Sequence, residues 1–385
     1  MTTNLSLLRG SVSICGVGTA GFGVAGDLDS IDLAALAASR AIADSGLKTK
    51  DVDGLFTASA YHFMPALSLS EYLGINPRVA DGTMIGGSSF VGYILSAMMA
   101  LATRQCDVAL IAYGSNQRSG KRPALTEASP FEAEYRPRNP ITPFALAASR
   151  HMHEFGTTRE QLAAVAVAAR RWAALNPDAF QRDPLAISDV LSSKMISDPL
   201  SVRDCCLITD GAGALVLKRT DERERSTRNK PVHVLGAGLD LAHRYIAGMT
   251  DMTRTGAARS GHRAYEMAGV TAADIDVVEL YDAFTISTLM FLEDLGFCKK
   301  GEGGPFVAAG HIDPGGLLPV NTNGGGLSCC HPGMYGIFTL IEAVVQLRGQ
   351  AGARQVDGAE LALSHGNGGA FLSQASVVLG TSSTL

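Results

Sequence analysis

The sequence has neither an excess of positive charge nor any long apolar run, and each of these absences argues against one kind of binding partner. It has 32 Lys and Arg against 37 Asp and Glu, so its formal net charge of -5 gives no overall basic field for nucleic acid or an anionic membrane. No apolar run approaches the roughly 18 residues that a membrane-spanning helix needs. We therefore expect neither nucleic acid nor a membrane as a partner.

Paired cysteine motifs are also missing. The seven cysteines include no Cys-x-x-Cys pair, and an odd number in a chain of 385 residues argues against a disulfide framework and a zinc site. We expect free thiols and no metal. The first residues, MTTNLSLLRGSVSICG, lack the basic segment, apolar core and cleavage signal of a secretory peptide, so we expect a cytoplasmic protein.

What the sequence does contain is an internal repeat. Residues 41–55, AIADSGLKTKDVDGL, align without a gap on residues 264–278, AYEMAGVTAADIDVV, at an offset of 223 (264 minus 41). Matched strands and helix-like runs flank both copies in the same order, which predicts a duplicated α/β fold with a mainly parallel, covered sheet. The matched strands are VSICGVG (12–18) and VHVLGAG (232–238), DVALIAYGS (107–115) and ELALSHGNGG (360–369), and TDGAGALVLK (209–218) and FLSQASVVLG (371–380).

The repeat divides the chain into halves at residues 1–225 and 226–385. The charged stretch DERERSTRNK (221–230) is predicted to be a solvated linker between them. The first half is longer by an insertion at about 116–200, which includes the helical pattern TTREQLAAVAVAARRWAAL (157–175). Long insertions on a rigid scaffold often form lids or binding loops. Two interpretations of the arginines in this insertion stay open: they contact an anionic nucleotide phosphate, or they lie in a solvent-exposed loop.

One glycine motif resembles a dinucleotide-binding sequence. GVGTAG (16–21) matches Gly-x-Gly-x-x-Gly, whose glycines let a pyrophosphate approach a helix N-terminus. Here the next helical pattern starts about ten residues later, near Asp29 or Ser30, so the glycines do not open a helix. We interpret the motif as a plain turn after a strand.

Four segments carry polar groups at predicted strand ends or helix starts, where α/β folds gather catalytic residues. His331 precedes Pro332 at a predicted helix start and suits proton transfer, with a buried structural histidine as the alternative. Tyr335, four residues on, would share its helical face, although tyrosine is more often a core residue. The segments are MIGGSS (84–89), ELYDAF (279–284), NTNGGGLSCCHPGMYG (321–336) and SHGNGG (364–369).

Three further candidates end predicted strands. Tyr281 and Asp282 follow one apolar strand, and His365 lies at the end of another, where catalytic groups and ordinary strand-end polar residues are both common. Ser88 and Ser364 lack the Gly-x-Ser-x-Gly context of a serine hydrolase, which makes that class a poor fit.

In this order on a duplicated chain, the four segments resemble the thiolase superfamily, specifically its sterol-carrier-protein-x and lipid-transfer-protein branch. The resemblance covers nearly the whole chain and implies a five-layered αβαβα architecture with a lid insertion in the first half. It places Gly86 where thiolases carry the nucleophilic cysteine, and Ser364 where they carry the second catalytic cysteine. The family's catalytic histidine matches His331, and its oxyanion-hole segment matches residues 280–284.

The resemblance also implies that glycines around the site contact the thioester oxygen. The candidate contacts are Gly86, Gly87, Gly325 and Gly368. Coenzyme A enters as part of the substrate, with no separately bound cofactor. A homodimer is expected, as is a small zinc-ribbon and OB-fold partner protein that would complete a heterotetramer.

A thiolase scaffold without a nucleophile, but with tyrosines at its site, is similar to the steroid side-chain aldolases. Retro-aldol cleavage of a β-hydroxyacyl-CoA needs an acid, a base and donors to the enolate, but no acyl-enzyme. We assign proton transfer to Tyr281 and Tyr335, thioester contact or proton transfer to His331, and support to His365. Tyr245 is a further candidate, in a loop that the sequence does not place.

Two alternatives remain open. The first is acyl transfer, as in acetyl-CoA acetyltransferase, with a displaced thiol such as Cys330 as nucleophile. The second is a subunit that binds acyl-CoA or forms a scaffold without catalysis.

Overall fold

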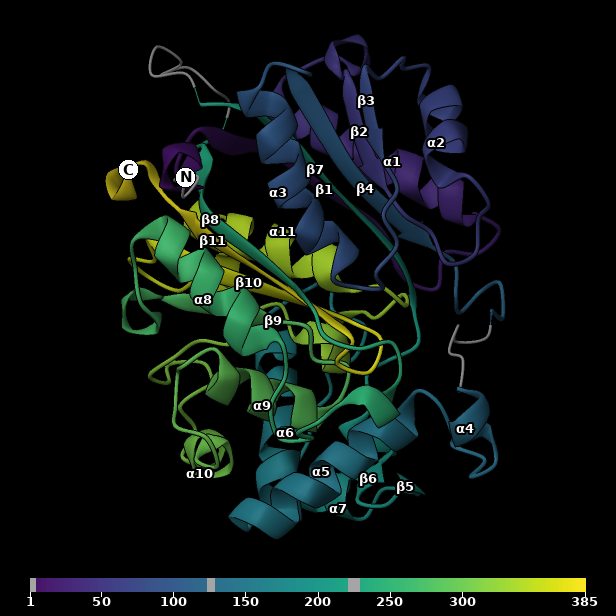
Figure 1. The fold of residues 1–385 in the computed structure, drawn as a ribbon, viewed down its shortest axis with the longest axis vertical. Coiled ribbons are helices and arrows are strands. Elements are labelled where there is room, and N and C mark those ends of the chain that lie inside the picture. The colour runs from purple at the N-terminus through teal and green to yellow at the C-terminus, as the bar shows by residue number, and fades with distance from the viewer. Residues whose placement is uncertain (1–4, 123–128, 221–228) are drawn as a thin grey trace.

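A nine-stranded mixed sheet forms the core of the computed structural model, which describes residues 5–122, 129–220 and 229–385 (Figure 1). The strand order is β3-β2-β4-β7-β1-β8-β11-β10-β9. The strands are β1 Val12–Gly23, β2 Gly54–Thr57, β3 Val79–Asp81, β4 Val108–Ser115, β7 Asp210–Arg219, β8 Val232–Leu241, β9 Val277–Leu280, β10 Leu361–Gly368 and β11 Ser373–Gly380.

The expectation of a mainly parallel sheet is wrong. Only β3 with β2, β2 with β4, and β10 with β9 run parallel, whereas the other neighbouring pairs are antiparallel. The last strand of each half, β7 or β11, inserts antiparallel beside the first strand of that half. Alternation of strands and helices therefore did not reveal the direction of these closing strands.

The two halves repeat the same local devices at the offset seen in the sequence. Helices α1 (Ser30–Ser45) and α8 (Ala257–Ala268) end at left-handed glycines, Gly46 with φ 76° and Gly269 with φ 69°. Five residues after each of these glycines, an aspartate side chain accepts a hydrogen bond from the backbone N–H of the residue three positions before it. Each helix then leads into a short parallel strand, β2 or β9.

The GVGTAG segment lies inside β1, so its interpretation as a turn after a strand is wrong. A Cβ on Gly16 would lie 2.1 Å from the Ala41 carbonyl oxygen of α1. Gly236 in β8 repeats this relation, at 2.0 Å from Ala264 O of α8. These glycines allow a helix to lie directly on the strand.

The helices complete five layers in the order αβαβα. Helix α1 packs on strands of the first half and α8 on strands of the second, while α3 (Ser89–Ala102) and α11 (Gly336–Leu347) contact strands of both halves and fill the central layer. Helix α2 (Pro65–Leu73) lies beside α1 at the outer face (Figure 1). The β1 and β8 strands pair at two residues, so one sheet runs through both halves.

The insertion after β4 forms a helical layer at the lower end of the view in Figure 1. Helix α6 begins after the Thr158 N-cap, whose hydroxyl accepts from Gln161 N, and it contacts α9, α10 and the segment 325–329. The elements of the insertion are α4 Pro130–Ala133, α5 Ile141–Phe155, α6 Arg159–Ala174, α7 Ile187–Leu191, β5 Met195–Ser197 and β6 Leu200–Ser201. Two helices of the second half, α9 Thr285–Asp294 and α10 Gly303–Ala308, lie in the same layer.

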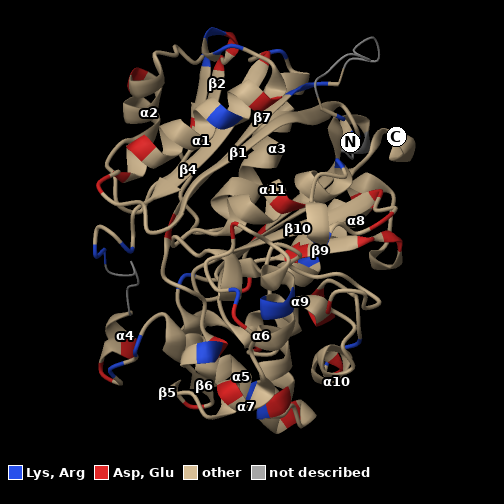
Figure 2. Ribbon diagram, turned by 180° about the vertical axis from the view of Figure 1, so that it is seen from behind, with Lys and Arg blue, Asp and Glu red and all other residues tan. Residues whose placement is uncertain are grey.

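The expected linker falls mostly on residues 221–228, which lie outside the described residues. Strand β7 ends at Arg219 and β8 begins at Val232, on either side of that segment. Within the described ranges, no helix combines the length and apolar character needed to cross a membrane. Figure 2 shows Lys and Arg interspersed with Asp and Glu along the helices and loops. The seven cysteines are free thiols, as expected.

Candidate active site

Tyr281 and His331 meet at the wall of a cavity of about 370 Å³. Tyr281 follows β9, and its hydroxyl donates to the Gly333 carbonyl at 2.9 Å. The His331 Nε2 lies 3.1 Å from the same hydroxyl oxygen. While the Tyr281 hydrogen is directed to Gly333, Nε2 donates to Tyr281 Oη; in the other tautomer the hydroxyl hydrogen turns to His331 and Nε2 accepts it. The two rings stand nearly perpendicular, at 83°.

Burial keeps both groups uncharged. It lowers the pKa of His331 to about 4, since a charged imidazolium would lose hydration there. It raises the pKa of the Tyr281 hydroxyl far above its usual value. At neutral pH the pair is therefore a neutral imidazole beside a protonated phenol.

The residues before α3 make room for this pair. A Cβ on Gly87 would lie 2.1 Å from Cε2 of Tyr281, so the tyrosine ring occupies the space that a side chain at 87 would fill. Gly86 has φ 77°, and a Cβ there would lie 2.8 Å from Gly368 Cα. Both Gly86 and Gly87 line the cavity. A side chain at either position requires the neighbouring backbone or ring to shift.

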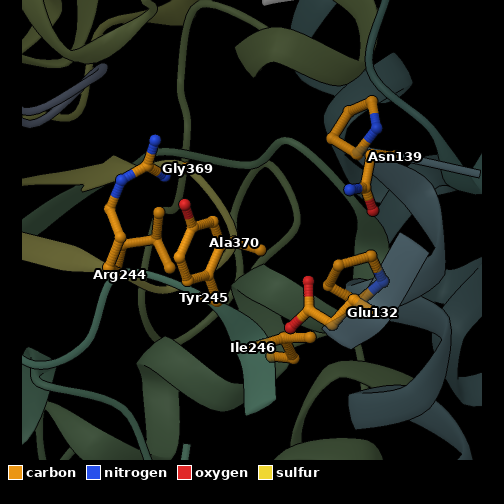
Figure 3. Close-up of a pocket in the computed structure, with 10 residues that line it drawn as sticks. Glu132, Asn139, Arg244, Tyr245, Ile246, Gly369 and Ala370 are labelled. Atoms are coloured by element: carbon orange, nitrogen blue, oxygen red, sulfur yellow. The ribbon is translucent and has the colours of Figure 1, made fainter. Parts of the chain in front are cut away.

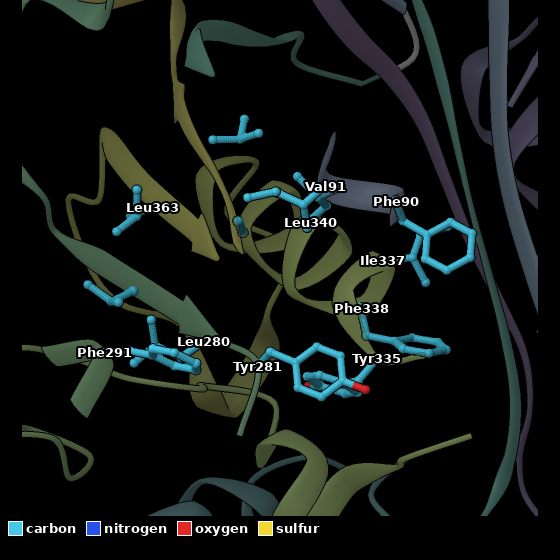
Figure 4. Packing of buried hydrophobic residues seen from close by; sticks show 14 of the residues in the cluster. Phe90, Val91, Leu280, Tyr281, Phe291, Tyr335, Ile337, Phe338, Leu340 and Leu363 are labelled. Carbon is cyan, nitrogen blue, oxygen red and sulfur yellow. The ribbon is translucent and has the colours of Figure 1, made fainter. Parts of the chain in front are cut away.

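Tyr335 lies next to Tyr281 among buried side chains (Figure 4). Its ring is nearly parallel to His331, with centroids 6.2 Å apart, and perpendicular to Tyr281. Its hydroxyl donates to Asn323 Oδ1 at 3.0 Å. The side chain is fully buried and is not among the residues that line the cavity. The structure thus brings Tyr335 against the imidazole without giving its hydroxyl access to the cavity.

The placement of His331 at a helix start is wrong. Helix α11 begins only at Gly336, and His331 lies in a loop after a single π-helical turn, Gly325–Cys329. Its backbone N–H donates to Thr209 Oγ1 at 2.9 Å. Thr209, directly before β7, and not helix geometry therefore holds this loop.

Asp282 holds the π-helical turn. Its carboxylate accepts the N–H of Gly326 at 2.6 Å and of Leu327 at 3.2 Å, and its side chain is fully buried. Burial raises its pKa to about 7, although the two backbone donors oppose this rise. A Cβ on Gly325 would lie 2.0 Å from Asp282 Oδ2, so Gly325 makes room for the carboxylate. Neither Asp282 nor Gly325 lines the cavity.

His365 is fully buried in β10, away from the cavity wall. Its Nδ1 lies 2.9 Å from Ser376 Oγ and its Nε2 lies 2.8 Å from Gln374 Oε1. Gln374 Nε2 in turn donates to Asn367 Oδ1 at 2.7 Å, and Asn367 does line the cavity. Burial lowers the pKa of His365 to about 4. It reaches the site only through this chain of hydrogen bonds.

Gly368 allows the backbone at Ile85 to pack closely against β10, and it does not line the cavity. A Cβ there would lie 1.9 Å from Ile85 O. Ser364 is fully buried and its hydroxyl is paired with Thr339 Oγ1 at 2.7 Å. The two positions that the sequence resemblance matches to the catalytic cysteines of thiolases hold a left-handed glycine, Gly86, and a paired serine.

Cys330 does not meet the requirements of a displaced nucleophile. It is fully buried, it does not line the cavity, and burial raises the pKa of its thiol. Cys205 and Cys206 line the cavity instead. Burial raises the pKa of the Cys205 thiol to about 12 and that of Cys206 well above its usual value. All three thiols are protonated at neutral pH.

Tyr245 lies beside a second cavity, of about 340 Å³ (Figure 3). The guanidinium of Arg244 lies 4.7 Å from the centre of its ring. Asn139 and Gly369 line both this cavity and the one at Tyr281, so the two spaces adjoin. In the described part of the chain, no group of three or more His, Cys, Asp and Glu side chains is arranged to hold a metal ion.

Sequence reasoning missed several residues of the cavity wall. Gln117 and Arg138 come from the insertion, and Asn367 was passed over within SHGNGG. Tyr113 was also missed, although its buried hydroxyl is hydrogen-bonded to Pro332 O and to Met334 N and so fixes the His331 loop. The available signal was position, because Tyr113 and Gln117 lie at or after the end of β4, as Asn367 lies near the end of β10.

Comparisons with known proteins agree with this architecture. Residues 238–381 match the family "Thiolase C-terminal domain-like". The acetyl-CoA acetyltransferase of Methanothermobacter thermautotrophicus is 35% identical, over 93% of this chain and 96% of its own. The steroid side-chain-cleaving aldolase of Thermomonospora curvata is 34% identical, over 94% and 97%. The 17-hydroxy-3-oxo-4-pregnene-20-carboxyl-CoA lyase of Mycobacterium tuberculosis is 34% identical, over 89% and 93%.

A solved Ltp2-ChsH2(DUF35) aldolase superposes with a TM-score of 0.88 at 30% identity, covering 97% of this chain and 98% of that chain. The five layers define a thiolase-fold protein whose cavity wall carries Tyr281 and His331 beside Gly86. The chain belongs to the thiolase superfamily, in the branch of sterol-carrier-protein-type and lipid-transfer-protein-type thiolase-like proteins. The resemblance stated from the sequence is confirmed.

Proposed function

We propose that this protein cleaves a carbon–carbon bond of a β-hydroxyacyl-CoA by a retro-aldol reaction. The observation that carries the proposal is the neutral Tyr281 and His331 pair, 3.1 Å apart at a cavity wall where position 86 offers no thiol. This pair can move protons but cannot form an acyl-enzyme. Relatives named as an aldolase and as a CoA lyase support the same chemistry.

The proposed reaction balances without an external acid or base. In the tautomer that carries its hydrogen on Nδ1, the neutral His331 takes the β-hydroxyl proton at Nε2 while the Cα–Cβ bond breaks and its electrons enter the thioester carbonyl. The Tyr281 hydroxyl then protonates Cα of the enolate, which releases an acyl-CoA and a ketone or aldehyde. The imidazolium returns its proton to Tyr281 Oη along their hydrogen bond. The site ends in its starting state.

The pKa shifts of the two side chains decide which acts as the acid and which as the base. Because burial raises the pKa of the Tyr281 hydroxyl, tyrosinate is a poor resting base, and this residue fits the role of acid. Because burial lowers the pKa of His331, its imidazole is available as a base at neutral pH. Tyr335 stacks on that imidazole and fits a positioning role. The glycine N–H groups at 86 and 87 are the proposed donors to the thioester oxygen.

We infer a steroid or another bulky lipid as the acyl group. The cavity wall is largely apolar and adjoins the second cavity at Asn139 and Gly369. The lyase relative is named for 17-hydroxy-3-oxo-4-pregnene-20-carboxyl-CoA, which makes this 17-hydroxysteroid thioester the first probe to use. Coenzyme A is then part of the substrate, and the proposed chemistry requires no further cofactor.

The test follows release of the steroid ketone from this probe by mass spectrometry. Tyr281→Phe removes the proposed acid and should lower kcat by about 10²- to 10⁴-fold. Tyr335→Phe should lower activity less, because its hydroxyl does not face the cavity. The proposal fails if both variants retain full cleavage. Purified protein with no turnover, alone or with its partner, would favour a subunit that binds acyl-CoA without catalysis.

One observation keeps acyl transfer as the second candidate function. The acetyl-CoA acetyltransferase relative covers almost the whole chain, and two thiols, Cys205 and Cys206, line the cavity. Intact-mass spectrometry after mixing with acetyl-CoA separates the two functions. An acylated cysteine would support transfer, and its absence together with ketone release would support the lyase.

We propose a homodimer and a DUF35-type partner protein of the zinc-ribbon and OB-fold kind as the assembly. The solved aldolase to which the chain is similar is named with its DUF35 protein, ChsH2. For the homodimer, the support is a group of exposed apolar residues on and directly before α2, the helix that precedes edge strand β3 in the chain. These are Phe63 81%, Met64 53%, Leu67 65% and Tyr72 59% exposed. Light scattering on the purified chain, with and without such a partner, tests both.

A further inference from the structure

The second cavity, beside Tyr245, has polar groups that the proposed reaction does not use. Its volume is about 340 Å³. At about 30 Å³ for each water-sized group it holds roughly ten such groups, which is about the size of two fused rings. Asn139, Pro140 and Gly369 line both this cavity and the one that holds the reacting pair. An acyl group too large for the first cavity therefore has room to extend into the second.

Arg244 and Tyr245 form one wall of this cavity (Figure 3). The guanidinium carbon of Arg244 lies 4.7 Å from the centre of the Tyr245 ring, which is within the range of a cation–π contact. Arg244 is exposed, so its N–H groups are open to a ligand. A guanidinium carries five N–H donors, so a contact elsewhere does not exhaust it. This wall therefore combines an aromatic face with hydrogen-bond donors.

Glu132 lies across the cavity from Arg244 and Tyr245 (Figure 3). Its two carboxylate oxygens already accept backbone N–H groups, from Ala247 at 2.9 Å and from Ser129 at 3.3 Å. Among the described residues that line this cavity, Arg244 and Glu132 are the charged ones, and their formal charges cancel. A carboxylate on the ligand would meet a like charge, whereas a neutral oxygen would not. The cavity therefore suits a neutral hydrogen-bond acceptor, such as a ketone.

The loop that carries Arg244 is held in place by backbone hydrogen bonds. Ala242 N donates to the Leu372 carbonyl at 2.9 Å, and Gly248 N donates to the Tyr245 carbonyl at 2.9 Å. The first bond fixes the start of the loop to the segment between β10 and β11, and the second closes a turn directly after the tyrosine. A wall that is ordered before the ligand arrives costs less entropy when it binds.

We propose that the second cavity binds the far end of the acyl group, where Arg244 donates a hydrogen bond to a neutral ketone oxygen. The proposal rests on the proposed function and deepens it, because it names the substrate class as thioesters of fused-ring acyl groups with an oxo group remote from the thioester. Tyr245 packs its ring against the apolar body of the ligand. Arg244 is a specificity-determining residue that is distant from the reacting atoms, so its contact is equal in the bound substrate and the transition state.

The test compares binding of the hydroxysteroid probe, whose 3-oxo group lies at the opposite end of the ring system from the thioester, with that of the same thioester carrying CH₂ at position 3. Calorimetry on the Tyr281→Phe protein avoids turnover. This protein should bind the oxo thioester roughly 3- to 15-fold more tightly. Adding Arg244→Met removes the donors and should reduce the preference to within about twofold. Arg254→Met is the matched control, because Arg254 is exposed, pairs with Asp251 at 3.5 Å and lines neither cavity.

A second variant tests whether the acyl group enters this cavity at all. Ala370 lines the second cavity and not the first, so Ala370→Leu narrows the second alone. It should weaken binding of the steroid thioester at least fivefold and leave binding of 3-hydroxybutyryl-CoA, whose acyl group is too short to reach this cavity, within about twofold. In steady-state kinetics, Arg244→Met should raise KM for the probe with kcat nearly unchanged. Thermal unfolding of each variant verifies its fold.

Three results would overturn the proposal. They are equal affinity of the Tyr281→Phe protein for the two steroid thioesters, a preference for the oxo thioester that persists in Arg244→Met, and unchanged binding of the steroid thioester in Ala370→Leu. All three are binding measurements, so they stand whether or not the unaltered protein cleaves the probe. Absence of cleavage with an intact, Arg244-dependent preference would reject the proposed function and keep the specificity role.

Discussion

At the residue scale, the proposed chemistry depends on two side chains that burial keeps neutral. Tyr281 and His331 share one hydrogen bond, and the pKa of each is moved away from neutrality in opposite directions. Proton transfer between them costs least when both start uncharged and the ligand supplies the first proton.

This arrangement predicts the pH dependence of cleavage. The base must be unprotonated, and burial lowers the pKa of His331 from 6.5 to about 4. kcat/KM should therefore stay level between about pH 5.5 and 8 and fall as the pH approaches 4. Initial rates across this range check the prediction, with circular dichroism to show that the protein stays folded. A fall centred near pH 6.5 would mean that the imidazole has an ordinary pKa.

Gly87 gives a second prediction at this scale. Its backbone has an ordinary φ, so only space limits substitution, and a Cβ would overlap the Tyr281 ring at 2.1 Å. Gly87→Ala should displace the ring and lower activity at least tenfold, with a stability loss of about 1 to 3 kcal/mol from overpacking. Activity and denaturant unfolding measure the two effects. Gly82→Ala is the matched control, since its nearest contact would be an ordinary 3.5 Å.

At the scale of elements, Asp282 connects the end of β9 to the π-helical turn 325–329. Its carboxylate accepts two backbone donors from that turn. Burial raises its pKa in the folded state from 3.8 to about 7. A raised folded-state pKa favours the folded state at low pH, and that contribution disappears as the pH rises through 7.

The free energy of unfolding of the natural protein should therefore fall relative to Asp282→Asn as the pH rises from 5 to 8. The change should be roughly 2 to 3 kcal/mol for a shift of about three pKa units. Urea unfolding of both proteins at the two pH values measures it, and the comparison cancels groups that titrate equally in both. A constant difference would show that Asp282 is ionised throughout.

How much of these elements could be predicted differs from residue to residue. The helix near Asp29, the strand within 107–115 and the helix within 157–175 were predicted from local sequence patterns, and the repeat at offset 223 reappears in Gly46 and Gly269. Gly16 was misread because its role is contact with Ala41 O, which is a tertiary distance. His331 was misplaced on a helix because Thr209, from a distant segment, holds its loop.

Tertiary contacts likewise decided which site residues could be predicted from the sequence. Tyr281 and His331 were expected together, and they are together. Tyr335 was expected beside them, and its ring is, but the direction of its hydroxyl towards Asn323 depends on packing that no spacing encodes. Gln117 was missed because an unpaired amide oxygen is visible only once its surroundings are known.

At the scale of the whole molecule, the insertion must stay docked on the second half for the cavity to exist. Helix α5 supplies Ile141 and Phe144 to the cavity wall, and His151 attaches the same helix to α9. The His151 Nε2 lies 3.0 Å from Glu293 Oε2, and Lys300 Nζ lies 3.1 Å from the same oxygen. His151 and the carboxylate of Glu293 are fully buried. This buried polar cluster joins the insertion to the thiolase-like core.

Glu293→Gln should weaken this connection between the insertion and the core while keeping the size and shape of the side chain. Removing one partner of a buried charged cluster leaves the others uncompensated and should cost about 3 kcal/mol of stability. Hydrogen exchange should then accelerate along α5, while β4 and β10 keep their protection because they lie in the central sheet. Cleavage of the hydroxysteroid probe should weaken through a higher KM, since the lid wall becomes less ordered.

Glu154→Gln on the same helix is the matched control. Its exposed i,i+4 pair with Arg150 should contribute less than about 0.5 kcal/mol, so exchange along α5 should stay unchanged. If Glu293→Gln accelerates exchange in α5 and in the central strands equally, the insertion and the core unfold as one cooperative unit. If neither region changes, the apolar contacts of α5 suffice to hold the lid, and the polar cluster has another role.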